Sequence, residues 1–191
     1  MQLSMCETTS LTDSGDIQKK YMKDIENASD AEELFSMIRK SYQMAFLKYT
    51  REYMAVDDFS RIFSGIWIRN ENPNRDPNVT IKTLIQWLRA SNKEILMKEA
   101  ELEVYRNYPE KIKIYRGVAV NRNPKGLSWT ENIEKAEWFA ERFNRKNKKG
   151  VVQEAYIAKE NVLAYFNRRG EDEIVVDARY LEDLKVIGAI E

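Results

Sequence analysis

Arg116 is the first residue that points to chemistry, because it interrupts an apolar strand face. The segment from Lys111 to Val120 alternates with period two and places Arg116 on the same face as Ile112, Ile114, Val118 and Val120. A buried guanidinium needs an anion against it, either a carboxylate of the protein or a phosphate held bidentately. Gly117, next along the strand, is typical of a position that another backbone or a ligand approaches closely.

The acidic triplet Glu171-Asp172-Glu173 is the second candidate. On a strand, Glu171 and Glu173 point to one side and Asp172 to the other. Paired carboxylates suit charge stabilisation at an oxocarbenium-like centre together with general-base work, which is the chemistry of breaking a glycosidic bond. A charged triplet before a strand is also typical of a solvated sheet edge, so both interpretations stand at this point.

Two hydroxyls and two aromatic rings complete the set of candidates. Ser128 and Thr130 lie two residues apart, so an extended segment places both hydroxyls on one face and Trp129 on the other. Thr130 is also suited to cap the helical pattern that follows it. Tyr165 and Phe166 precede a basic, glycine-containing turn, where they either pack or stack on a planar group.

The composition excludes several kinds of chemistry. The chain has 191 residues, with no histidine and one cysteine. It therefore cannot form a Ser-His-Asp triad, a Cys-His pair, a histidine metal site, a cysteine zinc site or an internal disulfide. Catalysis would have to use carboxylates, hydroxyls, lysine, arginine or tyrosine, and we expect no metal.

The charge balance argues against nucleic acid as a partner. There are 31 basic and 31 acidic residues, so no global field attracts a polyanion. The polar start of the chain does not resemble a signal peptide, and no apolar run approaches the length of a membrane span. We expect a cytoplasmic protein without a membrane anchor.

The patterning along the chain predicts an α+β fold in three parts. Residues 1–28 form a weakly ordered leader, residues 29–108 a helical region and residues 109–191 a region of sheet. Helices are expected from Ser29-Asp30 to about Tyr49, after Thr80, and from Ser91 to about Arg106, with a long loop over 59–77 between the first two. The expected elements of the last part are strands at 111–120, 151–158, 171–176 and 184–190, an extended segment at 127–130 and a short helix at 133–143.

Three motifs in this order resemble those of the Arg-Ser-Glu class of mono-ADP-ribosyltransferases, most of all its small bacterial and bacteriophage members. They are Tyr115-Arg116-Gly117, Leu127-Ser128-Trp129-Thr130 and Glu171-Asp172-Glu173-Ile174. The resemblance covers about residues 109–191. It implies a split β-sandwich that binds NAD between two sheets, preceded by a variable helical region.

The resemblance also implies roles for the candidate residues. Arg116 would hold the NAD phosphates, and the Gly117 backbone would bond the nicotinamide carboxamide. Ser128 would position Glu173, which would hold the nicotinamide ribose and stabilise the positive charge that forms as nicotinamide leaves. Glu171 matches the position that orients or deprotonates an acceptor guanidinium.

The remaining positions of the motifs are less specific. Thr130 would fill the last place of the Ser-x-Ser/Thr motif, while Trp129 departs from the small residue more common at its position. Tyr165 and Phe166 would fall in the loop that recognises the target, with Phe166 also a candidate contact for NAD.

The function that the resemblance implies is transfer of ADP-ribose from NAD to a protein acceptor, in the first instance arginine, with release of nicotinamide. One alternative is an NAD glycohydrolase, against which Glu171 argues, since hydrolysis needs only the second glutamate. Another is a non-catalytic binding or inhibitor module of the same fold, against which the intact set of Arg116, Ser128 and Glu173 argues. The sequence indicates no particular acceptor protein and no oligomeric state.

Overall fold

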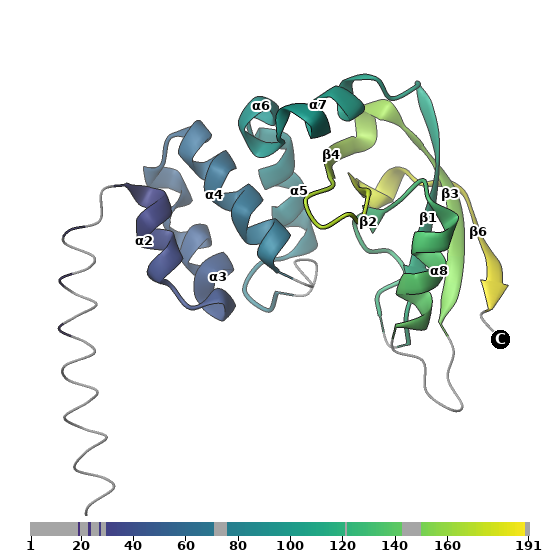
Figure 1. Ribbon diagram of the computed structural model, residues 1–191, viewed down its shortest axis with the longest axis horizontal. Coiled ribbons are helices and arrows are strands. Elements are labelled where there is room, and N and C mark those ends of the chain that lie inside the picture. Colours follow the sequence, from purple (N-terminus) through teal and green to yellow (C-terminus); the bar gives the residue numbers. More distant parts are fainter. Residues whose placement is uncertain are drawn as a thin grey trace, which may run out of the picture.

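The computed structural model describes Lys19, Lys23, Asn27 and residues 30–70, 76–120, 122–142 and 150–189. Within these residues the fold is α+β, with helices in the first half and two sheets in the second (Figure 1). The expected leader, 1–28, lies outside the described residues except for the three named above. Phe143, the expected end of the short helix, also lies outside them.

Helices make up the described part of the chain up to residue 106. They are α2 (Ala31–Met37), α3 (Lys40–Thr50), the 3₁₀ turn η1 (Arg51–Tyr53), α4 (Val56–Arg69), α5 (Ile81–Ala90), α6 (Lys93–Leu96) and α7 (Glu99–Arg106).

The prediction of a single helix through Tyr49 is wrong, because the helix is interrupted between α2, which ends at Met37, and α3, which begins at Lys40. The Gln43 side chain donates to the carbonyl oxygens of Phe35 and Ile38, both at 3.1 Å, and so bonds the backbone that the break exposes. The buried stripe includes Met44 and not Tyr49, which is 71% exposed. Aromatic and apolar spacing located the helices but not the face that packs.

The loop predicted over 59–77 is also wrong in its first half, which forms α4. Its apolar residues fall at helical spacing and are all buried: Phe59, Ile62, Phe63, Ile66 and Trp67. The turn formers after residue 69 do end this helix, as expected. The missed helix matters because it carries Trp67 to the candidate site.

The helix predicted after Thr80 is confirmed as α5, and the Thr80 hydroxyl accepts from the Thr83 amide at 3.1 Å. The next predicted helix is instead two short ones, α6 and α7. Asn92 caps α6, and the Glu101 carboxylate accepts from the Lys98 amide at 2.8 Å where α7 begins. A fresh cap at each start explains why one periodic stretch gives two helices.

The second half forms two antiparallel sheets of three strands each, ordered β1-β3-β6 and β2-β5-β4. Tyr115 and Thr130 join them through paired backbone hydrogen bonds of 2.7 and 2.9 Å. The elements are β1 (Lys111–Val118), β2 (Ser128–Trp129), α8 (Ile133–Glu141), β3 (Val151–Ala158), the 3₁₀ turn η3 (Lys159–Asn161), β4 (Val162–Phe166), β5 (Glu173–Val176), the 3₁₀ turn η4 (Ala178–Tyr180) and β6 (Glu182–Ala189).

Two differences from the predicted strands bear on function. Strand β4 was not predicted, and it includes Tyr165 and Phe166, which were expected on a mobile loop. Strand β5 begins at Glu173, so Glu171 and Asp172 precede it rather than belong to it. The expected strand at 151–158 is confirmed with the same bounds, as β3.

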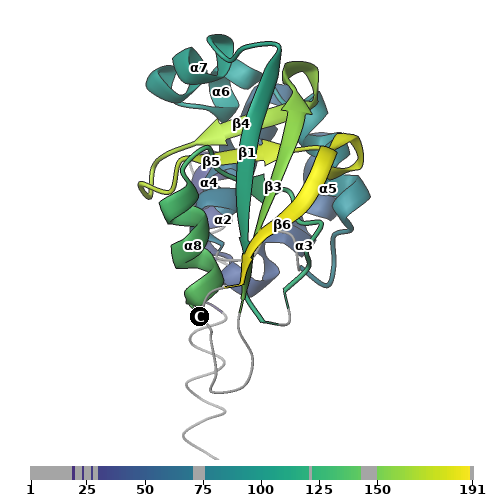
Figure 2. The same cartoon turned by 90° about the vertical axis from the view of Figure 1, so that its right-hand side faces the viewer.

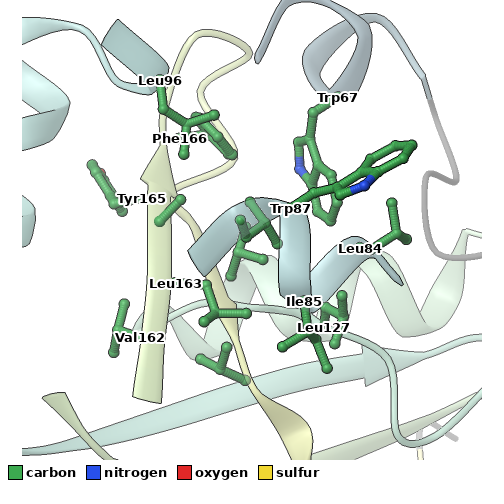
Figure 3. Packing of buried hydrophobic residues seen from close by; sticks show 14 of the residues in the cluster. Trp67, Leu84, Ile85, Trp87, Leu96, Leu127, Val162, Leu163, Tyr165 and Phe166 are labelled. Atoms are coloured by element: carbon green, nitrogen blue, oxygen red, sulfur yellow. The ribbon is translucent and has the colours of Figure 1, made fainter. Parts of the chain in front are cut away.

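One hydrophobic core runs from the helices into both sheets. It joins Trp67 and Trp87 of the helical half to Leu163 and Phe166 of β4 (Figure 3). The strands of the β1-β3-β6 sheet cross those of β4 and β5, with the helical half behind them (Figure 2). The regions 29–108 and 109–191 therefore share their core.

Helix α8 packs against β1 and β3 through two close backbone approaches. A Cβ on Gly117 would lie 1.9 Å from the Ala136 oxygen and 2.6 Å from the Ala140 nitrogen. A Cβ on Gly150 would lie 2.1 Å from the Ala140 oxygen. Of the two interpretations of Gly117, close approach by another backbone is the one that the structure shows.

We predict that Gly117→Ala lowers the free energy of unfolding by about 1–3 kcal/mol, because α8 must move to admit the methyl group. Thermal or denaturant unfolding measures the loss. Gly188→Ala in β6 is the matched control, since a Cβ there meets nothing within 4 Å, and it should change stability little. Equal stability of the two variants would contradict the packing described here.

Candidate active site

The carboxylate of Glu173 lies at the centre of the candidate site. Glu173 begins β5 and is 8% exposed. Its Oε2 accepts from the indole Nε1 of Trp67 at 3.2 Å, and its carboxylate also accepts a hydrogen bond from the Ser128 side chain. Burial raises the pKa of Glu173 above its ordinary value, while the bonds from Ser128 and Trp67 act in the opposite direction.

Strand register explains why Ser128 reaches this carboxylate. Ser128 pairs with Val175, two residues beyond Glu173, so Ser128 and Glu173 share a face as diagonal neighbours on β2 and β5. The two residues that the sequence placed in separate motifs are therefore brought together by the β2-β5 ladder.

Trp67 is the site residue that the sequence analysis missed. It comes from α4, where it is 1% exposed and packs against Phe166, with ring centroids 6.3 Å apart. Helical spacing in α4 predicts that Trp67 is buried, but no local pattern places its indole on a glutamate of β5.

Arg116 lies on the inner side of β1 beside β2. Its two terminal nitrogens donate to the backbone oxygens of Ser128 and Asn123, the second at 3.2 Å, while its Nε is buried without a partner. Its guanidinium lies so close to Gly126 that a Cβ there would meet Nη2 at 2.2 Å.

The charge of Arg116 has no carboxylate in direct contact within the described part of the chain, where none of the ion pairs includes it. Burial lowers the pKa of Arg116 to about 10, the negative charge of Glu173 raises it, and the nearby Arg122 lowers it. Arg116 is thus a cation at neutral pH, solvated by neutral carbonyls. This favours the phosphate interpretation over an internal ion pair.

The acidic triplet does not form the continuous strand that was predicted. Asp172 has φ 46°, in the left-handed region, so Glu171 and Glu173 do not share a strand face. Asp172 accepts from the Tyr165 hydroxyl at 2.9 Å and from the Lys135 ammonium, and these bonds hold the unusual backbone. Glu171 pairs with Arg169 at 2.6 Å.

The two glutamates occupy different environments even so. The side chain of Glu171 is 23% exposed, whereas Glu173 is buried. The charge of Glu171 raises the pKa of Glu173, although burial contributes more, so the two carboxylates remain electrostatically coupled. The pair thus has one carboxylate shielded from water and one partly open to solvent.

Three further candidate residues, each predicted as a contact for NAD, are buried beside the site: Trp129, Thr130 and Phe166. Trp129 is 2% exposed and donates its indole N–H to the Gly126 oxygen at 3.0 Å. Thr130 is 4% exposed and accepts from the Asn132 amide, and Asn132, not Thr130, caps α8. Phe166 is 1% exposed because it packs in the core beside Trp67.

Comparison with protein-family models, with curated proteins and with solved structures finds no match for this chain. Among the described residues, no helix is long and apolar enough to cross a membrane. The same residues contain no group of three or more His, Cys, Asp or Glu side chains that would hold a metal ion.

We predict that Glu173→Gln raises the melting temperature at pH 7. A raised pKa means that the folded state binds the proton more tightly, so stability falls as pH rises through the ordinary value of 4.5 and the raised folded value. Glutamine keeps an oxygen for Trp67 and has no charge to bury. The difference between variant and wild type, followed by thermal melts, should shrink towards pH 4.

Glu154→Gln is the control with the opposite sign. Glu154 is also nearly buried, but bonds from Lys185 and Lys113 lower its pKa, so its charge stabilises the fold at neutral pH. This variant should melt below the wild type at pH 7. A lower melting temperature for both variants would contradict the interpretation that burial of the Glu173 charge destabilises the fold at pH 7.

Proposed function

We propose that this protein is an NAD-dependent mono-ADP-ribosyltransferase that transfers ADP-ribose to a protein guanidinium and releases nicotinamide. The observation that carries the proposal is the buried Glu173 carboxylate, bonded by Ser128 and Trp67 and within electrostatic reach of Arg116. Two crossing sheets joined at Tyr115 and Thr130 are consistent with the split β-sandwich that the resemblance implies.

The hydrogen-bond donors and the positive charge of Arg116 suit the pyrophosphate of NAD. A guanidinium whose Nε is buried and unpaired has a hydrogen-bond donor available to a phosphate oxygen. Arg122 adds a second positive charge close enough to change the pKa of Arg116. Arg116 would hold the phosphates, and Glu173 the ribose on the nicotinamide side.

The chemistry needs no nucleophilic side chain. NAD supplies an electrophilic ribose carbon and its own leaving group. Glu173 places a negative charge in a site from which water is largely excluded, where it stabilises developing positive charge far better than in water. Ser128 and Trp67 fix the orientation of this carboxylate, so little reorganisation is needed when charge develops.

Glu171 favours a transferase over a glycohydrolase. Its side chain is partly exposed and bonds a guanidinium, that of Arg169, at 2.6 Å. A carboxylate in this position would bind an acceptor guanidinium and remove its proton. Water as the acceptor would require no such group.

We predict that Glu173→Gln lowers nicotinamide release and transfer together, by about 10²–10³-fold. The assay uses adenylate-labelled NAD with a cell lysate, and mass spectrometry follows labelled protein and free nicotinamide. Glu182→Gln is the matched control, because Glu182 of β6 forms an exposed ion pair with Lys111 of β1, and this variant should leave both rates unchanged. Absence of both products from the wild type, with no effect of NAD on its melting temperature, would favour a non-catalytic binding module.

We predict that Arg116→Lys raises KM for NAD about tenfold, equivalent to ~1.4 kcal/mol, because a point ammonium cannot replace the planar fork. The rate at saturating NAD should change less, since phosphate contacts are made in ground and transition states alike. Steady-state kinetics of nicotinamide release separate the two effects. Arg61→Lys, at an exposed pair with Asp58, is the control. An unchanged KM would remove Arg116 from the NAD site.

A further inference from the structure

The guanidinium of Arg169 occupies the position in which the proposed function would place an acceptor. Its Nη2 donates to Glu171 Oε2 at 2.6 Å, and its Nη1 donates to the Ile68 oxygen at the end of α4 at 3.0 Å. Its charge also reaches the buried carboxylate, because Arg169 lowers the pKa of Glu173. A guanidinium of the chain thus bonds the exposed glutamate and lies close enough to the buried one to change its pKa.

We propose that Arg169 is an internal acceptor, so that the protein ADP-ribosylates itself there within the same chain. This inference rests on the proposed function and names the chemical class of its acceptor, a guanidinium. Its geometric basis is that Glu171 holds this arginine by a charge-assisted hydrogen bond, in the arrangement that an acceptor needs.

The neighbouring arginine shows that this placement is specific. Arg168 lies in the same turn, but it pairs with Glu101 at 3.2 Å and bonds the Leu96 oxygen at 2.9 Å. Arg168 therefore fastens the turn to the helical half. Arg169 has a side chain that is 34% exposed and contacts Glu171 instead.

The turn that carries Arg169 is fixed from both ends. The Gly170 amide donates to the Asn167 oxygen at 3.0 Å, and the Asp172 amide donates to the Asn167 side chain at 3.2 Å. Lys135 bonds Gly170 and Asp172. These bonds fix the turn from which Arg169 reaches Glu171.

The step balances without a further reagent. A terminal nitrogen of Arg169 forms a bond to C1′ of the nicotinamide ribose as the bond from C1′ to the nicotinamide nitrogen breaks. The electron pair of that bond leaves with nicotinamide, and the proton lost from the guanidinium passes to Glu171. NAD is consumed once for each chain modified.

The test incubates the purified full-length protein with adenylate-labelled NAD and no other protein, and mass spectrometry maps the label. We expect label on Arg169, formed with a half-time that dilution of the protein does not change. Arg169→Lys keeps a cation against Glu171 and should lose the label. Arg61→Lys, at an exposed arginine–carboxylate pair on α4, should label as the wild type does.

A mixture of two variants tests whether the reaction occurs within one chain. Glu173→Gln retains Arg169 but lacks the catalytic carboxylate. Arg169→Lys retains this carboxylate but lacks the acceptor arginine. In the mixture, Arg169 of the Glu173→Gln chain should stay unlabelled. Label on that chain would overturn transfer within one chain.

A measurement without NAD tests the guanidinium site by itself. Agmatine, a small free guanidinium compound, should raise the melting temperature of Arg169→Ala but not of the wild type, whose own arginine fills the position. Putrescine, which has an amine in place of the guanidinium, is the control and should shift neither protein. Equal shifts of wild type and variant by agmatine would overturn the proposal.

The outcomes separate this inference from the function on which it rests. Label on added agmatine together with an unlabelled Arg169 in the wild type would overturn the internal acceptor and leave the transferase in place. No nicotinamide release under any condition would remove both.

Discussion

The main constraint on the candidate site is that the Glu173 carboxylate is buried with no cation bonded to it among the described residues. Such a charge is costly to bury, and hydrogen bonds must replace the water it loses. Here one donor comes from Trp67 in the helical half and another from Ser128 in the β2-β5-β4 sheet. The position of this carboxylate therefore requires that both halves of the chain be assembled.

The helical half is thus part of the site rather than an attachment to it. The shared core packs Trp67 against Phe166, and an ion pair at a second place also joins the two halves. Asp177 is fully buried and accepts from Arg179 at 2.6 Å and from Arg89 of α5 at 3.1 Å. These bonds, that of Arg179 most of all, lower the pKa of Asp177, so its charge stabilises the fold above acidic pH. Changes in the helical half that move α4 will also move the Trp67 indole, which donates a hydrogen bond to Glu173.

The turn between β4 and β5 gives two neighbouring glutamates different surroundings. The positive φ of Asp172 separates Glu171 from the strand, and the bonds from Tyr165 and Lys135 stabilise this conformation. Glu173 then enters the core while Glu171 remains partly exposed beside Arg169. A regular strand would have placed both carboxylates on one face and destabilised the charge on each.

Local patterns in the sequence determined much of the secondary structure and the types of the site residues. The period-two pattern predicted β1 and the face of Arg116, and the segment 151–158 predicted β3. The absence of histidine left carboxylates, hydroxyls, lysine, arginine and tyrosine as the groups available for catalysis. Only the tertiary structure decided which residues of the site contact one another. Trp67 and Glu173 are 106 residues apart, and the placement of Arg169 on Glu171 depends on a turn with a positive φ. Periodicity is a property of one element and indicates its secondary structure, whereas contacts between distant residues arise only when separate elements pack together.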